Sequence, residues 1–405
     1  MKFKSIFFLF CGMFLSCSFF EPNVIVIWTD QPEFVLYARL FNENQDRYYA
    51  EVQYVESLAQ QLNNTKEYPD IAVGYWLKNT VTRNLFRQLN NNTEDFYTHL
   101  LELGKVEEKQ YLLPVSFNIP ALVFSQKNAA RISNYWTIPL EEIQELAREY
   151  TVLRGGVYTQ IGFSPDWDDA FLSAIIRLFG IDFREGTPLE WNKEAFEEAM
   201  IFLHTWVHQT ITNAQAADDF LFKYFAEPPA TRINSGHILF TAMDSATFFK
   251  LRQESRAALD FHWITDNDSI PVIEETVYYG ICKKGRAPSA SQAFTEWFFN
   301  TDTQRMLIEE NENLNIHDTH FGISNGFSGM RTVSEQVFPL FYPELLAHIP
   351  PEEFLSPPNV LPPLWTQIKK NVILPYIRER IKTPDQADER SLERRINDWY
   401  RLNAR

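Results

Sequence analysis

The chain has 405 residues, of which 45% are hydrophobic and 15% aromatic. This length exceeds what one hydrophobic core organises, so we expect two or three domains, and the hydrophobic share excludes a wholly disordered chain. The formal net charge is −16, with 53 acidic and 37 basic side chains and no basic cluster. Because phosphate binding needs a basic surface, this balance argues against a nucleic-acid-binding protein.

The N-terminus has the pattern of an export signal. Lys2 and Lys4 precede an apolar run over residues 6–15, which is about half as long as a membrane crossing requires. We therefore interpret residues 1–16 as a signal peptide rather than a membrane-spanning helix. Phe-Leu-Ser-Cys at 14–17 resembles the lipobox of bacterial lipoproteins. This resemblance implies an exported protein held at a membrane by lipid on Cys17; ordinary signal cleavage near Phe20 is the alternative.

The next part of the chain alternates strand and helix patterns. The apolar, β-branched run at 24–28 predicts a strand buried on both faces, and a helical pattern follows Pro32. Further strands are predicted at 50–55 and 71–73, with a polar helix at 57–62 between them. Such alternation indicates parallel βαβ units in an open α/β sheet.

The α/β pattern continues to about residue 320. An extended stretch covers 112–124 and is broken by Pro114 and Pro120. Beyond Phe321 the chain is rich in proline and predicts loops, closed by an amphipathic helix over 391–403. The other predicted elements are helices at 139–150, 192–208 and 289–300, and strands at 237–242, 258–264 and 277–282.

Common catalytic signatures are absent from the sequence. It contains no G-x-G-x-x-G, no G-x-x-x-x-G-K-[ST], no G-x-S-x-G and no H-E-x-x-H. His204 and His208 share a predicted helix face, but no carboxylate lies at the matching turn, and His317 and His320 lie in a polar loop. We therefore expect no enzyme, no metal site and no cofactor. A secreted hydrolase with paired carboxylates is an alternative supported only by the acid-rich loops.

Segments spread over nearly the whole chain carry a resemblance to one family. The strand at 24–28 is followed by residues 68–74, in which Pro-Asp-Ile opens a strand. Stretches at 111–124 and 280–284 match crossings between lobes, and 358–365 matches a late loop that carries an aromatic residue. In this order the segments resemble the extracellular solute-binding proteins of bacterial ABC importers, in the sugar- and maltodextrin-binding class.

The resemblance implies a two-lobed α/β fold of the periplasmic-binding-protein type (type II), with a ligand cleft between the lobes. Residues 17–116 with 275–316 would form lobe 1, and 117–274 with 317–405 would form lobe 2. The implied partners are a small polar solute, a carbohydrate, and the permease subunits of an ABC transporter. Hinge closure of the lobes would bury the solute.

Ligands of open α/β sheets bind beyond the carboxyl ends of strands, and sugars are held by aromatic faces and polar side chains. Strand alternation turns only one of Tyr278 and Tyr279 toward the cleft.

This chain has Ala246 at a position where the family often has an aromatic residue. The alternative is therefore a surface lipoprotein of the same fold that has no transport role and serves sensing or adhesion. The ligand-binding candidates are Trp28, Asp30, Tyr75, Trp76, Asn118, Trp167, Asp168, Asp244, Tyr279 and Trp365.

Overall fold

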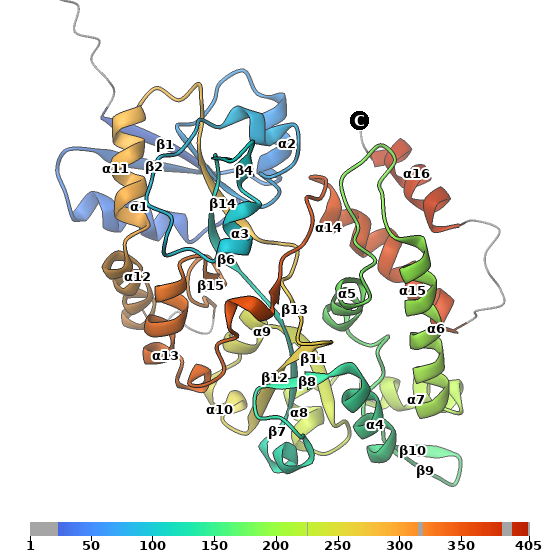
Figure 1. Ribbon diagram of the computed structural model, residues 1–405. Helices are drawn as coiled ribbons and strands as arrows, with labels where there is room; N and C mark the ends of the chain where they lie inside the picture. The colour runs from blue at the N-terminus through green and yellow to red at the C-terminus, as the bar shows by residue number, and fades with distance from the viewer. Residues whose placement is uncertain (1–22, 225, 315–318, 383–390, 404–405) are drawn as a thin grey trace, which may run out of the picture.

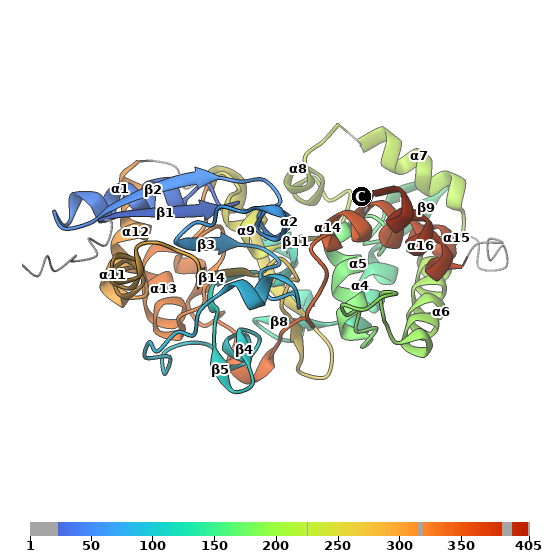
Figure 2. The same ribbon diagram turned by 90° about the horizontal axis from the view of Figure 1, so that it is seen from above.

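The computed structural model describes residues 23–224, 226–314, 319–382 and 391–403. Two lobes lie side by side and are joined by a few crossing segments (Figures 1 and 2). The predicted signal peptide and Cys17 lie outside the described residues.

A six-stranded sheet forms the centre of lobe 1, in the order β15-β6-β14-β3-β1-β2. β1 pairs in parallel with β2 and β3, whereas β14 is antiparallel to both β3 and β6. The parallel strands are linked through helices α1 and α2, as parallel pairing requires. The strands are β1 (Val24–Thr29), β2 (Tyr49–Tyr54), β3 (Ile71–Gly74), β6 (Leu113–Phe117), β14 (Val277–Ile281) and β15 (Phe327–Ser328).

A four-stranded sheet forms the centre of lobe 2, in the order β11-β7-β12-β8. Both β11 and β12 are antiparallel to β7, while β8 runs parallel to β12. The strands are β7 (Pro120–Ser125), β8 (Thr137–Pro139), β11 (Phe240–Asp244) and β12 (Leu259–Thr265). Three further two-stranded pairs are β4 (Lys105–Val106) with β5 (Lys109–Gln110), β9 (Val152–Arg154) with β10 (Val157–Gln160), and β13 (Ile270–Pro271) with β16 (Leu355–Ser356).

Helices cover both sheets (Figure 1). Those of lobe 1 are α1 (Phe34–Glu43), α2 (Leu58–Asn64), α3 (Thr98–Glu102), α11 (Pro288–Phe298), α12 (Thr301–Asn313) and α13 (Phe338–Phe341). Those of lobe 2 are α4 (Leu140–Tyr150), α5 (Asp169–Leu178), α6 (Lys193–Thr210), α7 (Ala214–Tyr224), α8 (Pro229–Asn234), α9 (Ser245–Phe249), α10 (Gln253–Arg256), α14 (Trp365–Ile368), α15 (Leu374–Lys382) and α16 (Leu392–Asn403).

Most predicted elements are confirmed. Helix α1 buries one apolar face, and α6 begins after Asn192, whose side chain accepts hydrogen bonds from the first turn. Three expectations were wrong. β11 begins at Phe240 rather than 237, helices α14 and α15 lie in the region predicted as loop, and β15 joins the lobe 1 sheet although we assigned residues beyond 316 to lobe 2.

Asp70 joins three parts of lobe 1. Its carboxylate accepts hydrogen bonds from the backbone N–H of Val26 at 2.9 Å in β1, of Ala287 at 2.8 Å, and of Arg286. Ala287 and Arg286 directly precede α11, so the carboxylate also lies at the positive end of that helix. Asp70 is buried. The Pro-Asp-Ile segment is therefore explained by packing of the sheet against α11.

We predict that Asp70→Ala lowers the free energy of unfolding by about 2–4 kcal/mol, because it leaves buried N–H groups without acceptors. Urea denaturation of the variant measures this loss. The exposed Asp46 provides the control, and Asp46→Ala should change stability by less than about 0.5 kcal/mol. Equal stability of the two variants would contradict the role given to Asp70.

Candidate functional site

The chain passes from one sheet to the other within two residues. β6 ends at Phe117 and β7 begins at Pro120, which leaves only Asn118 and Ile119 between the sheets. The Asn118 side chain accepts hydrogen bonds from Ser245 Oγ at 2.6 Å and from the N–H of Ala246, and it donates to the carbonyl of Asn325 at 2.8 Å. Asn118 therefore lies at the crossing, with its amide bonded to segments on both sides.

The carboxyl ends of β1 and β3 bring Asp30 and Tyr75 together. The Asp30 carboxylate accepts hydrogen bonds from Gln31 Nε2 at 2.6 Å and from the N–H of Tyr75 at 3.3 Å. Gly74 makes this approach possible, since a Cβ at that position would lie 2.4 Å from Asp30 Oδ1. Two of the predicted residues thus meet at the edge of the sheet where ligands bind in open α/β folds.

Burial raises the pKa of Asp30 to about 6, and the hydrogen bonds from Gln31 and Tyr75 only partly offset it. Burial also raises the pKa of the Tyr75 hydroxyl, with a further contribution from Asp30. In the described part of the chain no cation forms an ion pair with Asp30. Such a carboxylate is suited to accept hydrogen bonds from the hydroxyl groups of a ligand.

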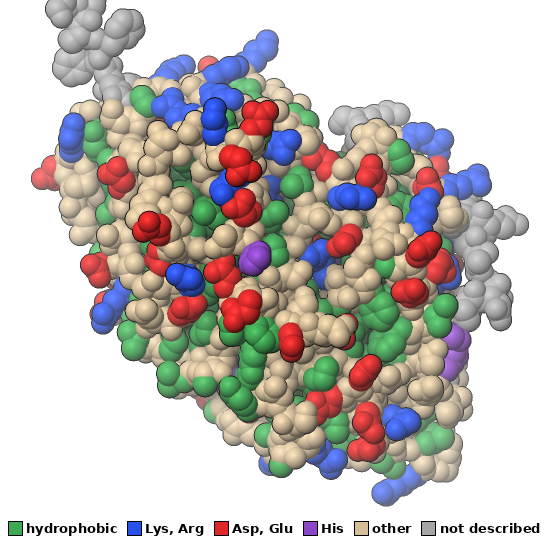
Figure 3. Space-filling view, in the orientation of Figure 1, with side chains coloured by type: hydrophobic (Ala, Val, Ile, Leu, Met, Phe, Trp, Pro, Cys, Tyr) green, Lys and Arg blue, Asp and Glu red, His purple; other side chains and the backbone are tan. Residues whose placement is uncertain are grey.

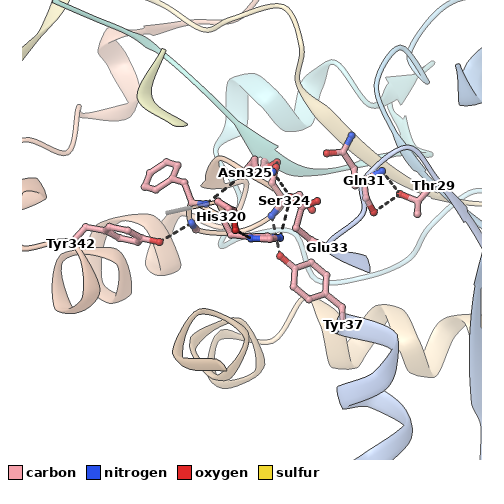
Figure 4. Close-up of polar contacts among 12 residues, drawn as sticks. Thr29, Gln31, Glu33, Tyr37, His320, Ser324, Asn325 and Tyr342 are labelled. Atoms are coloured by element: carbon pink, nitrogen blue, oxygen red, sulfur yellow. Dashed lines mark hydrogen bonds and ion pairs between the residues drawn. The ribbon is translucent and has the colours of Figure 1, made fainter. Parts of the chain in front are cut away.

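A polar cluster joins the start of α1 to the turn at 322–326 (Figure 4). The amide of Asn325 donates to Glu33 Oε1, and Nε2 of His320 lies 4.0 Å from the same oxygen. The N–H of Ser324 donates to the hydroxyl of Tyr37 at 3.0 Å. Burial raises the pKa of Glu33. Because Asn325 also accepts from Asn118, the cluster connects the end of β1 to the crossing between the sheets.

The loop after β3 contacts lobe 2 directly. Trp76 packs against apolar clusters of both lobes. The N–H and hydroxyl of Thr80 donate to the two carboxylate oxygens of Glu185, at 2.9 and 3.0 Å. Trp76 therefore lies at the seam between the lobes, where it packs against side chains of the protein itself.

A second crossing, which leads into β14, is fixed by an ion-pair cluster. Lys369 Nζ lies 2.9 Å from Glu274 and 3.2 Å from Glu275, and Thr366 also donates to Glu275. Burial alone would lower the pKa of Lys369, but the two carboxylates more than offset this and raise it. The C-terminal helices are thereby attached to the crossing segment.

Trp167 lines a cavity of about 540 Å³ within lobe 2. Its walls come from the ends of α6, α7 and α15, and they include Val207, Ile211, Leu221 and Arg378. The volume is in the range of small-molecule pockets, and the mixture of an indole, aliphatic groups and charges is common in them. The half-buried ring of Trp167 therefore lies at the wall of a cavity. This cavity is inside lobe 2, whereas the sequence predicted a ligand site between the two lobes.

Two predicted site residues lie in hydrophobic cores, and we correct them. Tyr279 is 0% exposed, and its hydroxyl shares a hydrogen bond of 2.7 Å with Thr295, so it belongs to the core of lobe 1. Trp365 is also 0% exposed and packs against Phe183 in lobe 2. Tyr278 is equally buried, so neither tyrosine of the pair faces a cleft.

Three other candidates have structural contacts. Asp168 accepts hydrogen bonds from the N–H of Ala242 at 2.8 Å and from Thr241, which ties α5 to β11; burial raises its pKa to about 6. Asp244 accepts hydrogen bonds from Thr247 at the start of α9. The half-buried ring of Trp28 packs against the small apolar cluster of lobe 1.

Sequence reasoning missed several polar residues near the seam. Gln31 and Glu33 directly follow the nominated Asp30, so the strand-end rule could have found them. Lys78 lies in the loop after β3 and Arg177 in α5, and nothing in the local sequence marks either side chain as buried. Charged side chains are ordinarily exposed, and contacts with segments distant in sequence, such as that of Lys78 with Tyr278, change this expectation.

Surface charge, metal-binding groups and membrane-spanning helices do not point to a further site in the described residues. Acidic and basic side chains are interspersed over both lobes on the face seen in Figure 3. No group of three or more His, Cys, Asp or Glu side chains in the described ranges is placed to hold a metal ion. Among the described helices, none has the length and apolar character needed to cross a bilayer.

Comparison with solved structures identifies the architecture. The bacterial solute receptor AcbH, described as having an exclusive preference for β-D-galactopyranose, is 12% identical, with a TM-score of 0.65 over 94% of this chain and 100% of the receptor. An ABC substrate-binding protein from Listeria monocytogenes in complex with cycloalternan is 11% identical, with a TM-score of 0.62 over 94% and 99%. A cyclic α-maltosyl-1,6-maltose binding protein from Arthrobacter globiformis is 13% identical, with a TM-score of 0.61 over 93% and 96%.

No protein-family model matches the chain, and the search of curated proteins finds no relative. The similarity therefore rests on the arrangement of helices and strands over more than nine-tenths of the chain. It confirms the predicted two-lobed periplasmic-binding-protein fold, the fold of ABC solute receptors.

The raised pKa of Asp30 gives a pH-dependent prediction. An acid whose pKa rises from about 3.9 in the unfolded chain to about 6 in the native protein stabilises the native state below pH 4, and this contribution is lost as pH rises through 6. Asp30→Asn removes that loss. The unfolding free energy of the variant minus that of the original protein should therefore be about 1–3 kcal/mol larger at pH 7 than at pH 4.

Denaturant titrations of both proteins at pH 4 and pH 7 measure the difference, and contributions from other acids cancel in it. Asp46→Asn, at an exposed position, serves as the matched control and should show no such change. A pH-independent difference for Asp30→Asn would mean that Asp30 is not destabilised by burial.

Proposed function

We propose that this protein is the solute-binding component of an ABC importer and that it captures a saccharide between its two lobes. The observation that carries the proposal is the meeting of Asp30, Gln31 and Tyr75 at the carboxyl ends of β1 and β3, beside the crossing at Asn118. The fold shared with sugar-binding receptors supports it. The protein would act by binding alone, without catalysis or cofactor.

In this proposal each part of the site has a distinct task. The carboxylate of Asp30 and the amide of Gln31 would bind sugar hydroxyl groups, and the ring of Tyr75 would cover an apolar sugar face. Trp76 would close the seam from lobe 1, while Trp167 would offer a second ring from lobe 2. Lobe closure about Asn118 would bring the two surfaces together.

The proposed setting is outside the cytoplasmic membrane. Lipid on Cys17 would hold the protein at the membrane surface, and the closed, loaded protein would deliver its solute to the permease subunits. The basic N-terminus, the short apolar run and the Phe-Leu-Ser-Cys sequence support export and anchoring. Metabolic labelling with a fatty acid, lost in Cys17→Ser, tests the anchor independently of binding.

A thermal-shift screen over neutral and acidic mono- and oligosaccharides, amino acids and polyamines tests the binding function. A saccharide that binds only the folded protein should add about 2.7 kcal/mol of stability at 100 times its Kd and raise Tm by several degrees. Amino acids and polyamines should leave Tm unchanged. If no saccharide raises Tm, the proposed function is wrong.

Asp30→Asn should weaken binding of the saccharide found in that screen at least tenfold at pH 7, because a hydrogen bond to a charged acceptor contributes about 1.5–3 kcal/mol. Isothermal titration calorimetry measures the affinity. Two controls are Asp46→Asn and Tyr135→Ala, which change exposed side chains and should keep the original Kd. Unchanged affinity in Asp30→Asn would remove Asp30 from the site.

A further inference from the structure

Lys78 is a buried lysine that lacks a hydrogen-bond acceptor. It follows Trp76 in the loop after β3, and it is only 5% exposed. Its Nζ lies 4.8 Å from the centre of the Tyr278 ring, and no hydrogen-bond acceptor contacts it in the described part of the protein. Buried ammonium groups are nearly always paired, because leaving one unpaired costs free energy.

A second cation faces Lys78 from the other lobe. Arg177 extends from α5, and its side chain is 9% exposed. One of its terminal nitrogens donates to the carbonyl of Pro357 at 2.7 Å, while Nε is buried and has no partner among the described residues. Burial, with a smaller contribution from Arg177, lowers the pKa of Lys78 to about 7. Two buried side chains of like charge, one from each lobe, therefore lie within electrostatic reach of each other.

The neighbouring carboxylates do not neutralise this pair. Asp182 contacts Arg177 at 3.3 Å but is itself 56% exposed, so solvent screens it. Glu274 lines the same small cavity as Arg177. Its Oε2 is bound by Lys369 at 2.9 Å, and its Oε1 is buried without a hydrogen-bond partner among the described residues and forms no ion pair with Arg177. Arg177 lowers the pKa of Lys78 further, as a nearby like charge does. An anion placed between Lys78 and Arg177 would satisfy both cations and attach one lobe to the other.

We propose that the solute is an acidic saccharide, whose anionic group is bound by Lys78 from lobe 1 and by Arg177 from lobe 2. This inference rests on the proposed function and specifies its substrate class. The anionic group can be a carboxylate, as in a uronic acid, or a phosphate ester, because both accept several charge-assisted hydrogen bonds. Closure of the lobes would be favoured by the anion, since it removes the repulsion between the two cations.

Calorimetry with matched sugars tests this proposal. Glucose is compared with glucuronate and glucose 6-phosphate, and galactose with galacturonate, so that the members of each set share a ring and differ in the anionic group. We expect at least one acidic sugar to bind ten times or more tighter than its neutral counterpart. The carboxylate and phosphate arms distinguish the two sources of the anion.

Lys78→Met removes the charge while keeping a long side chain. It should weaken binding of the acidic sugar at least tenfold and leave any binding of the neutral sugar within twofold. The exposed Lys66 supplies the control, and Lys66→Met should change neither affinity. Because Lys78 is unpaired and buried, the Tm of Lys78→Met without sugar should equal or exceed that of the original protein, which also verifies folding.

Three results would overturn the inference. Neutral sugars that bind as tightly as their acidic counterparts would leave the proposed function standing and exclude an acidic substrate. Unchanged acidic-sugar affinity in Lys78→Met, or a lower Tm of this variant, would exclude Lys78 as the anion-binding group. Binding of no saccharide in any set would overturn both the inference and the proposed function.

Discussion

The two sheets of this protein are joined through a crossing only two residues long, and the remaining architecture depends on it. Asn118 and Ile119 leave no room for an independent linker, so the edges of both sheets must lie close together. The amide of Asn118 bonds to Ser245 on one side and to Asn325 on the other. Because the crossing fixes where the sheets meet, it also fixes which strand ends face one another across the seam.

Charged side chains are concentrated at this seam in an unusual way. Lys369 is buried with its two carboxylate partners, which balance its charge. The half-buried Asp30 and the buried Lys78 of lobe 1, in contrast, have no oppositely charged partner among the described residues. Burial of unpaired ionisable groups costs stability and is found more often at functional sites than elsewhere. The direct contact between Thr80 and Glu185 contributes to holding the lobes together while these groups are buried.

Much of the fold could be predicted from the sequence because its signals are local. Apolar runs identified β1 and β3, and the 3.6-residue period identified α1 and α6. The rule that ligands lie beyond strand ends, applied to these strands, selected Asp30 and Tyr75, which the structure brings into contact. The proline-rich C-terminal region concealed α14 and α15, because proline at helix starts reads locally as a loop.

The errors in the site have a different physical origin. An aromatic residue after a strand can face a ligand or a core, and the choice depends on helices distant in sequence: α11 covers Tyr279, and Phe183 covers Trp365. Lys78 shows the converse, since its charged side chain is buried over the ring of Tyr278, which is distant in sequence. The most direct measurement is a crystal structure with the saccharide that most stabilises the protein. Our account predicts a sugar enclosed by both lobes and touching Asp30; a sugar bound to one lobe only, or on the outer surface, would contradict it.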